Sequence, residues 1–231
     1  MPKFNMLATL RRLLLVSAGA IALSSPVMAQ VSPDLLARVQ ARADLETQEN
    51  ALPHGLAAYE RADYAEAVRW YRLAADQGNA RAQGNLGTMY QDGRGVPQNY
   101  AEAVRWYRLA ADQGHANAQL NLGAMYANGL GVPQNDAEAV RWYRLAADQG
   151  YAFAQGMLGF SYALGKGVPE NLVESYKWLS LDAAQRADAA EGRDLVRGRM
   201  TPAQIAEGQK LAAEWKPEAL SGVERLAGAH Q

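Results

Sequence analysis

Residues 64–99 read YAEAVRWYRLAADQGNARAQGNLGTMYQDGRGVPQN, and this stretch decides the fold because the chain repeats it. Residues 100–135 read YAEAVRWYRLAADQGHANAQLNLGAMYANGLGVPQN, and residues 136–171 read DAEAVRWYRLAADQGYAFAQGMLGFSYALGKGVPEN. The copies follow each other at a period of 36 residues, and a decayed fourth copy begins at Leu172. A period of this length is typical of arrays in which each unit buries its apolar surface against the next.

Local signals divide each copy into two helices. In the first copy, Gly78 is expected to end a helix that runs to Gln77, and Gly93 to end a second helix from about Ala80 to Asp92. A capping box is predicted at four helix starts, where Asp or Asn precedes a glutamate by three residues: Asp63, Asn99, Asn135 and Asn171.

Both helices of a copy carry apolar residues at the helical period, so each must bury one face. Glycine recurs inside the second helix, at Gly87, Gly123 and Gly159. Glycine costs about 1 kcal/mol relative to alanine in a helix interior. We therefore expect the paired helix to approach closely at these positions. The decayed copy is expected to keep the aromatic pair as Tyr176 and Trp178.

Three motifs in each copy resemble those of the Sel-one-like repeat (SLR) family, a relative of the tetratricopeptide repeat. In the first copy they are the Ala-x-x-Trp-Tyr run that starts at Ala67, the Ala-Gln-x-x-Leu-Gly-x-x-Tyr run that starts at Ala82, and the Gly-x-Gly-Val-Pro loop. The resemblance covers about residues 51–185. It implies an all-α, right-handed α-solenoid of helix-turn-helix repeats that acts as a scaffold for protein assembly, commonly in bacterial envelopes and in signalling.

The first 29 residues have the pattern of a secretory signal peptide. Lys3, Arg11 and Arg12 form a basic start, residues 13–23 are apolar, and Val27-Met28-Ala29 is a small-residue cleavage site. The apolar run is too short for the roughly 20 residues of a membrane span. We expect export, to a bacterial periplasm or otherwise into the medium, with no membrane span.

The expected organisation of the whole chain follows from these features. It comprises a signal peptide at 1–29, an N-terminal helical cap at 30–63, repeats at 64–99, 100–135 and 136–171, a degenerate repeat with a C-terminal helical cap at 172–215, and a flexible tail at 216–231.

Charge argues against nucleic acid as a partner. Cleavage removes three of 23 basic residues and no acid, which leaves 20 against 24 acidic residues, whereas phosphate binding needs a clustered cationic surface. The repeated Arg-Trp-Tyr-Arg run is interpreted as structural, with Arg72 and Asp76 forming an ion pair along the helix.

No catalytic, metal or cofactor site is predicted. The Gly-x-Gly loops lack the continuation of a dinucleotide or P-loop motif and are interpreted as helix ends and turns. His54, His115 and His230 have no second ligand at metal-binding spacing and are expected to be solvated. Cysteine-rich members of the resembled family are credited with binding or cleaving β-lactams, but this chain has no Cys and no Ser-x-x-Lys. The main prediction is thus a non-catalytic scaffold. The alternative, which the resemblance suggests, is a cell-wall-directed enzyme or a peptidoglycan or β-lactam binder.

Positions that differ between copies indicate where a partner binds. On the second helix they are spaced 3, 4 and 4 residues apart, hence on one helical face, which the resemblance implies lines the concave groove. They change from polar in the first copy to apolar in the third, and an exposed apolar patch often marks a partner site. The predicted partner-binding residues are Arg81, Thr88, Asn117, Leu120, Phe153, Phe160 and Leu164.

A second explanation of the apolar residues is open. A helix is predicted from Pro202 to Trp215, with a capping box at Thr201 and Gln204, and it would cover Phe153 and Phe160 if it folds back as a cap. In that case Phe153 would be part of the core rather than part of a binding surface.

Overall fold

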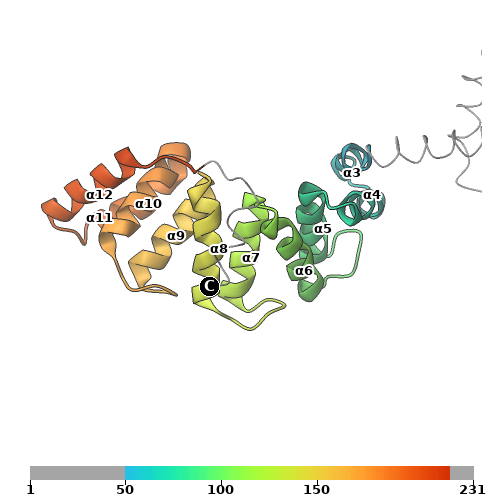
Figure 1. Ribbon diagram of the computed structural model, residues 1–231, viewed down its shortest axis with the longest axis horizontal. Helices are drawn as coiled ribbons and strands as arrows, with labels where there is room; N and C mark the ends of the chain where they lie inside the picture. The colour runs from blue at the N-terminus through green and yellow to red at the C-terminus, as the bar shows by residue number, and fades with distance from the viewer. Residues whose placement is uncertain (1–49, 219–231) are drawn as a thin grey trace, which may run out of the picture. The chain divides into compact units, whose positions relative to one another are not determined.

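The computed structural model describes residues 50–218, and every regular element in that range is a helix (Figure 1). The predicted signal peptide, the start of the N-terminal cap and residues 219–231 of the predicted tail lie outside the described residues. The elements are α3 Ala51–Glu60, α4 Tyr64–Asp76, α5 Ala80–Asp92, α6 Tyr100–Asp112, α7 Ala116–Asn128, α8 Asp136–Asp148, α9 Ala152–Leu164, α10 Leu172–Gln185, the short 3₁₀ helix η2 Ala187–Ala189, α11 Ala190–Arg197 and α12 Pro202–Glu214.

Helices α4 to α9 form the three intact copies, two helices to a copy. Gly93, Gly129 and Gly165 end α5, α7 and α9 in the left-handed conformation, as their positions predict. None of the helices in residues 50–218 is long and apolar enough to span a bilayer. The successive helix pairs form the all-α solenoid that the repeat predicts.

The predicted capping boxes are only half formed at the starts of α4, α6, α8 and α10. The Asp63 side chain accepts the N–H of Glu66 at 3.2 Å, and the three asparagines do the same. The glutamate side chains do not return to the cap. Glu66 instead accepts from Arg69 at 3.0 Å and from Trp70 at 2.7 Å, because a charged donor on the same helix is a stronger partner than a backbone N–H.

Each second helix packs most extensively against the first helix of the following copy. A Cβ atom on Gly87 would lie 2.7 Å from the Tyr107 ring, and one on Gly123 would lie 2.6 Å from Tyr143. The close approach predicted from these glycines is confirmed, but the expectation that the helix of the same copy makes it is wrong. In the decayed copy Leu179, not an aromatic residue, occupies this position and packs on Gly159. Of the aromatic pair expected in the decayed copy, Trp178 stands at the position of Trp70, but Tyr176 does not take the position of Tyr71.

A line of glutamine side chains connects successive copies inside this packing. The Gln83 amide donates to the Ala75 carbonyl at 3.1 Å, and its Oε1 accepts from Gln113 of the next copy at 2.7 Å. The same pair recurs as Gln119 with Gln149 and as Gln155 with Gln185. A buried polar group costs little when it is hydrogen-bonded, so this line joins the copies without unpaired amides.

The predicted ion pair between Arg72 and Asp76 is not formed. The Arg72 guanidinium donates instead to the Tyr90 hydroxyl of α5, and Arg108 and Arg144 bond Tyr126 and Tyr162 in the same way. This contact closes the two helices of one copy on each other. The arginine side chain extends across to α5 and not along its own helix toward Asp76.

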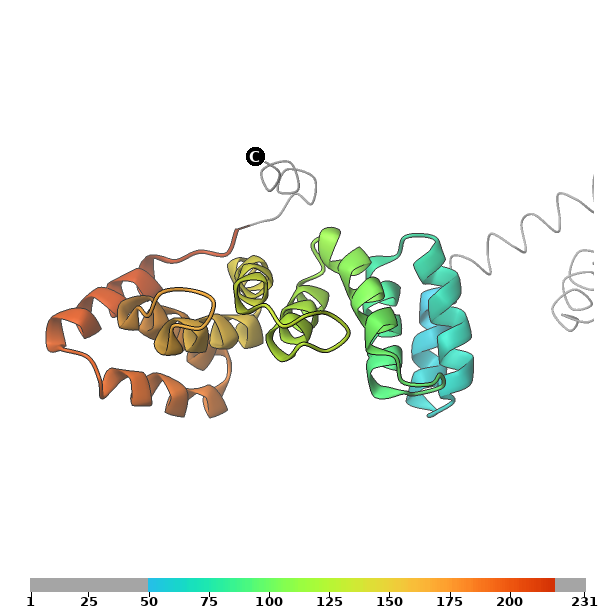
Figure 2. The ribbon, with the colours of Figure 1, turned by 90° about the horizontal axis from the view of Figure 1, so that it is seen from below.

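The C-terminal part of the described chain departs from the repeat. Helix α12 begins with the predicted capping box and packs on α10, with Gly208 against Tyr176. Residues 216–218 have no regular secondary structure, and the Glu218 N–H donates to the Asp148 carbonyl at 2.9 Å. Figure 2 shows this segment leaving α12 and running back along the array. This hydrogen bond attaches the start of the predicted tail to the end of α8, although residues 216–218 are exposed.

Candidate partner-binding surface

The seven predicted partner-binding residues all lie in the second helices of the three copies. We call the surface that carries them the second-helix face. Helix α5 contributes Arg81 and Thr88, α7 contributes Asn117 and Leu120, and α9 contributes Phe153, Phe160 and Leu164.

An exposed apolar patch occupies the α9 part of this face. It consists of Phe153, Met157, Phe160 and Leu164, of which Phe153 is 52% exposed and Leu164 is 63% exposed. The corresponding positions of α5 are polar, namely Arg81, Asn85, Thr88 and Asp92. The apolar character therefore belongs to the third copy alone and is not required by the packing that all copies share.

The guanidinium of Arg186 covers one side of the patch. It lies 3.8 Å from the centroid of the Phe153 ring, and its Nε is 3.5 Å from a carboxylate oxygen of Asp182. Asp182 is buried, and burial raises the pKa of its carboxyl above the ordinary value despite the neighbouring arginine. Gly156 provides the space, because a Cβ there would lie 2.3 Å from the Asp182 carboxylate. Asp182 and Asp188, which accepts two hydrogen bonds from the guanidinium, thus hold Arg186 over Phe153.

The second explanation, in which the helix from Pro202 covers the patch, does not match the described structure. Helix α12 packs on α10, where Trp215 contacts Trp178 edge to face at 6.0 Å between ring centroids. A different helix, α11, touches the patch: a Cβ on Gly192 would lie 2.7 Å from the tip of Phe160. Because both phenylalanines stay more than 40% exposed, the patch is a surface feature of the described chain.

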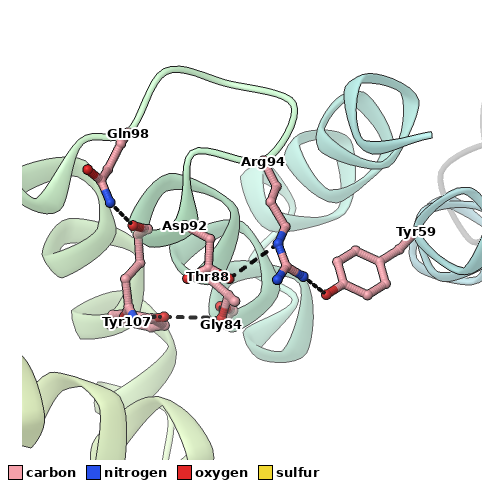
Figure 3. A network of polar contacts seen from close by, with 8 residues as sticks. Tyr59, Gly84, Thr88, Asp92, Arg94, Gln98 and Tyr107 are labelled. Atoms are coloured by element: carbon pink, nitrogen blue, oxygen red, sulfur yellow. Dashed lines mark hydrogen bonds and ion pairs between the residues drawn. The ribbon is translucent and has the colours of Figure 1, made fainter. Parts of the chain in front are cut away.

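In the first copy, the second-helix face is tied into the array by polar contacts (Figure 3). The Thr88 hydroxyl lies 3.1 Å from the Tyr107 hydroxyl, which donates to Gln91 at 3.0 Å. Arg94 donates to Tyr59 at 2.6 Å and pairs with Asp92 at 3.6 Å. Thr88 is therefore a packing residue that joins α5 to α6, while Arg81 remains exposed.

The two predicted residues of the middle copy, Leu120 and Asn117, also make contacts within the fold. Leu120 packs against the apolar cluster of the third copy. Asn117 is exposed, but its amide donates to the Tyr151 hydroxyl at 2.7 Å. Of the seven predicted residues, the structure brings only Phe153, Phe160 and Leu164 together as an exposed cluster.

His115 is not the solvated residue that we expected. It caps α7, with Nδ1 accepting the N–H of Ala118 at 3.2 Å, and its ring packs on Gly84. Burial, together with the charge of Arg81, lowers the pKa of the imidazole from 6.5. The neutral form is the one that can accept the capping hydrogen bond, so His115 has a structural role.

The Gly-x-Gly loops are turns, as their sequence predicts. Gly93 ends α5 with φ +69°, and a Cβ on Gly95 would lie 2.3 Å from the carbonyl oxygen of Tyr64. Both glycines are thus explained by backbone conformation and close packing. Within residues 50–218, no cluster of three or more histidine, aspartate or glutamate side chains is placed to hold a metal ion.

Arg186, Asp182 and α11 surround the patch but were not identified from the sequence. One signal was present: at the position of Asp182 the intact copies have alanine, at Ala74, Ala110 and Ala146. A charged residue at a position that is otherwise alanine indicates a local function or a local partner.

Comparisons with known proteins agree with the repeat architecture. A family model described as Sel1 repeat matches residues 54–79, 80–115, 116–151 and 152–185, more than half of the chain. Each unit of the family model contains the second helix of one copy and the first helix of the following copy, and these two helices pack most extensively on each other. The copies defined from the sequence start 16 residues before the units of the family model. No curated protein matches the chain.

Two crystal structures of repeat proteins are similar to the chain. A Sel1 repeat protein from Oxalobacter formigenes is 30% identical, with a TM-score of 0.59 over 82% of this chain and 73% of that one. A protective antigen of uropathogenic Escherichia coli with an SLR fold is 26% identical, with a TM-score of 0.51 over 72% of this chain. The match spans only 44% of the length of the E. coli protein.

Proposed function

Because the chain belongs to the Sel1 repeat family, whose members are generally scaffolds for protein–protein interaction, we propose that it is an exported, non-catalytic scaffold that binds a protein or peptide through its second-helix face. The concave groove implied by the resemblance would be formed by this face. Partner identity is set, in this proposal, by side chains that the repeat itself does not require.

The observation that carries the proposal is the apolar patch on α9. Four large apolar side chains, each at least 40% exposed, follow one helical face: Phe153, Met157, Phe160 and Leu164. Contiguous apolar surface of this kind is uncommon on monomeric proteins away from interaction sites. Arg186 adds a cation beside Phe153, and aromatic and arginine side chains are the groups that dominate binding energy at interfaces.

Export is proposed from the sequence of residues 1–29, which combine a basic start, an apolar middle and a small-residue cleavage site. Expression of the full chain in a bacterial host with N-terminal sequencing of the product tests it. A product that begins at Gln30 in the periplasmic fraction supports export, and an uncleaved chain in the cytoplasm contradicts it.

Affinity capture from envelope extract tests the binding surface. The wild type is compared with a Phe153→Ser, Phe160→Ser variant and with Arg69→Ser, a substitution at an exposed position of the first helix. The proposal expects a partner that the wild type and Arg69→Ser retain and the double variant loses, with unchanged circular dichroism. Equal retention by all three proteins would assign the partner to another surface.

The alternative, a cell-wall enzyme or peptidoglycan or β-lactam binder, is tested in parallel. Covalent labelling of the purified chain by a fluorescent penicillin, or its cosedimentation with peptidoglycan, would replace the scaffold proposal.

A further inference from the structure

The residues after α12 occupy a defined site at the end of α8. We call residues 215–218 the C-terminal segment. The Trp215 ring lies edge to face on Trp178, its tip is 3.7 Å from where a Cβ on Gly150 would stand, and Pro217 approaches the same point to 3.6 Å. The Glu218 N–H then bonds the carbonyl of Asp148, in the last turn of the helix.

The parts of this site are a terminal helix carbonyl, a glycine in the left-handed conformation and the tryptophan of the next copy. Helix ends leave carbonyl groups without intrahelical partners, and glycine leaves room for a ring to lie close to the backbone. We call this combination the helix-end site. In the third copy it is filled by the chain itself.

The same site exists in the first two copies. Asp76, Gly78 and Trp106 form it in the first copy, and Asp112, Gly114 and Trp142 form it in the second. The backbone has the same shape in all three, with φ of +87° at Gly78, +85° at Gly114 and +86° at Gly150.

In these two copies the glycine and the helix-end carbonyl are open among the described residues, whereas Trp106 and Trp142 are themselves buried. No described atom lies within 4 Å of a Cβ placed on Gly78 or Gly114, in contrast to Gly150. No N–H of the described chain outside the helical ladder bonds the carbonyl of Asp76 or Asp112. The two sites therefore present the same unpaired acceptor that Glu218 uses in the third copy.

The leucine next to each site differs in exposure between the filled site and the open sites. Leu181 packs, together with Trp215, against the apolar cluster of the third copy. Its counterpart in the first site is Leu109, which is 41% exposed. Leu145, the counterpart in the second site, is partly buried. The first site thus exposes apolar surface at a position that is packed in the third copy.

We propose that the two open helix-end sites bind an extended segment of a partner protein in which a tryptophan precedes a proline by two residues. The tryptophan lies over the glycine, the proline keeps the backbone extended, and the following N–H bonds the helix carbonyl. The occupant comes from another protein because the chain's own segment is held in the third copy at the high effective concentration of a tethered group. These sites involve other residues than the second-helix face and do not depend on it.

The test uses a peptide with the sequence of residues 213–220, AEWKPEAL, titrated calorimetrically into the chain that contains all described residues. The wild type is expected to bind two peptides. The same peptide with alanine in place of tryptophan is expected to bind at least about tenfold more weakly, because buried tryptophan side chains dominate such contacts.

Three variants of the protein locate the sites. Leu109→Glu is expected to reduce the number of bound peptides from two to one, whereas Leu195→Glu, at another exposed leucine, leaves it at two. Trp215→Ala empties the third site and is expected to raise the number to three. Circular dichroism confirms the fold of each variant.

Several results would overturn the proposal. Binding only to Trp215→Ala, with none to the wild type, would show that the site serves the chain's own segment alone. Affinity unaffected by loss of the peptide tryptophan, or equal stoichiometry in Leu109→Glu and Leu195→Glu, would exclude the helix-end sites. Self-association of the wild type that Trp215→Ala abolishes would assign them to a second copy of the chain.

Discussion

The side-chain amide of Gln149 donates to the Oε1 of Gln119 at 2.7 Å, across the boundary between the second and third copies. Gln119 is buried, and its own amide donates to the Ala111 carbonyl at 3.1 Å. One glutamine therefore satisfies two groups on two different first helices. The same residue type at Gln83 and Gln155 makes this a recurring connection between copies.

Gln119→Leu should destabilise the protein by about 1–3 kcal/mol, because it removes a side-chain donor of the buried Ala111 carbonyl and the acceptor of the Gln149 amide. Urea denaturation measures the change. Gln134→Leu, at an exposed loop position, is the control and should stay within about 0.5 kcal/mol of the wild type. Equal stability of both variants would show that the glutamine line does not join the copies.

Gly123→Ala should cost about 1–3 kcal/mol, since the added Cβ would lie 2.6 Å from the Tyr143 ring and 3.1 Å from the Ala139 carbonyl. This loss acts against the gain of about 1 kcal/mol in helix propensity. Gly198→Ala provides a matched comparison, because its nearest neighbour would be at an ordinary 3.5 Å. Thermal denaturation should rank Gly123→Ala well below Gly198→Ala, and the reverse order would contradict the packing described here.

Ala127→Gln should stabilise the protein by about 1 kcal/mol, because the second copy lacks a hydrogen bond that the first copy has. The Tyr107 hydroxyl donates to Gln91 at 3.0 Å, whereas the buried Tyr143 hydroxyl has no partner, and Ala127 stands at the position equivalent to Gln91. Burial raises the pKa of both phenols to about 12, so both stay protonated donors. Ala127→Leu, which adds bulk without an acceptor, should not give this gain in a urea titration.

His115 should make stability depend on pH. Its folded pKa lies below 6.5, so between these two values the unfolded chain binds a proton that the folded chain does not. The contribution is fully present above about pH 6.5 and is lost as the pH falls toward the folded pKa. His115→Asn introduces the residue that caps α5 in the first copy, Asn79, and does not titrate. Melting temperatures from pH 7.5 to 5.5 should fall more steeply for the wild type than for His115→Asn, and parallel curves would contradict the assignment.

Phe153→Ala should change the free energy of unfolding by less than about 1 kcal/mol, because half of the side chain is exposed. A core phenylalanine would cost about 3–5 kcal/mol. Urea denaturation distinguishes the two values. A loss in the core range would mean that residues outside the described chain cover the patch, and would remove the basis for a binding surface there.

The repeat made the fold predictable to within about a residue at most helix ends. The helix ends at Gly93 and at the asparagine caps depend only on neighbouring residues, so they can be predicted from the sequence. The partner of each close contact was less predictable: Gly87 indicates that something approaches, but not that Tyr107 of the next copy does so. Arg72 has an acid at helical spacing and yet bonds Tyr90 across the helix pair.

Only part of the candidate site could be predicted from the sequence. Differences between copies identify positions that the shared packing leaves free, and Phe153, Phe160 and Leu164 are exposed as such a pattern requires. Thr88 and Leu120 meet the same criterion but are used for contacts that one copy makes and the others lack. The sequence alone does not distinguish a position free to bind a partner from one that has acquired a local contact.

The most direct test of the account places a photo-crosslinking amino acid on the second-helix face. Benzoylphenylalanine at Met157, between the two phenylalanines of the patch, is compared with the same group at Arg69 on the first helix, after irradiation in living cells. The account predicts a crosslinked partner protein at position 157 and none at position 69. Crosslinks at position 69 alone, or none at position 157 when a partner copurifies with the chain, would contradict it.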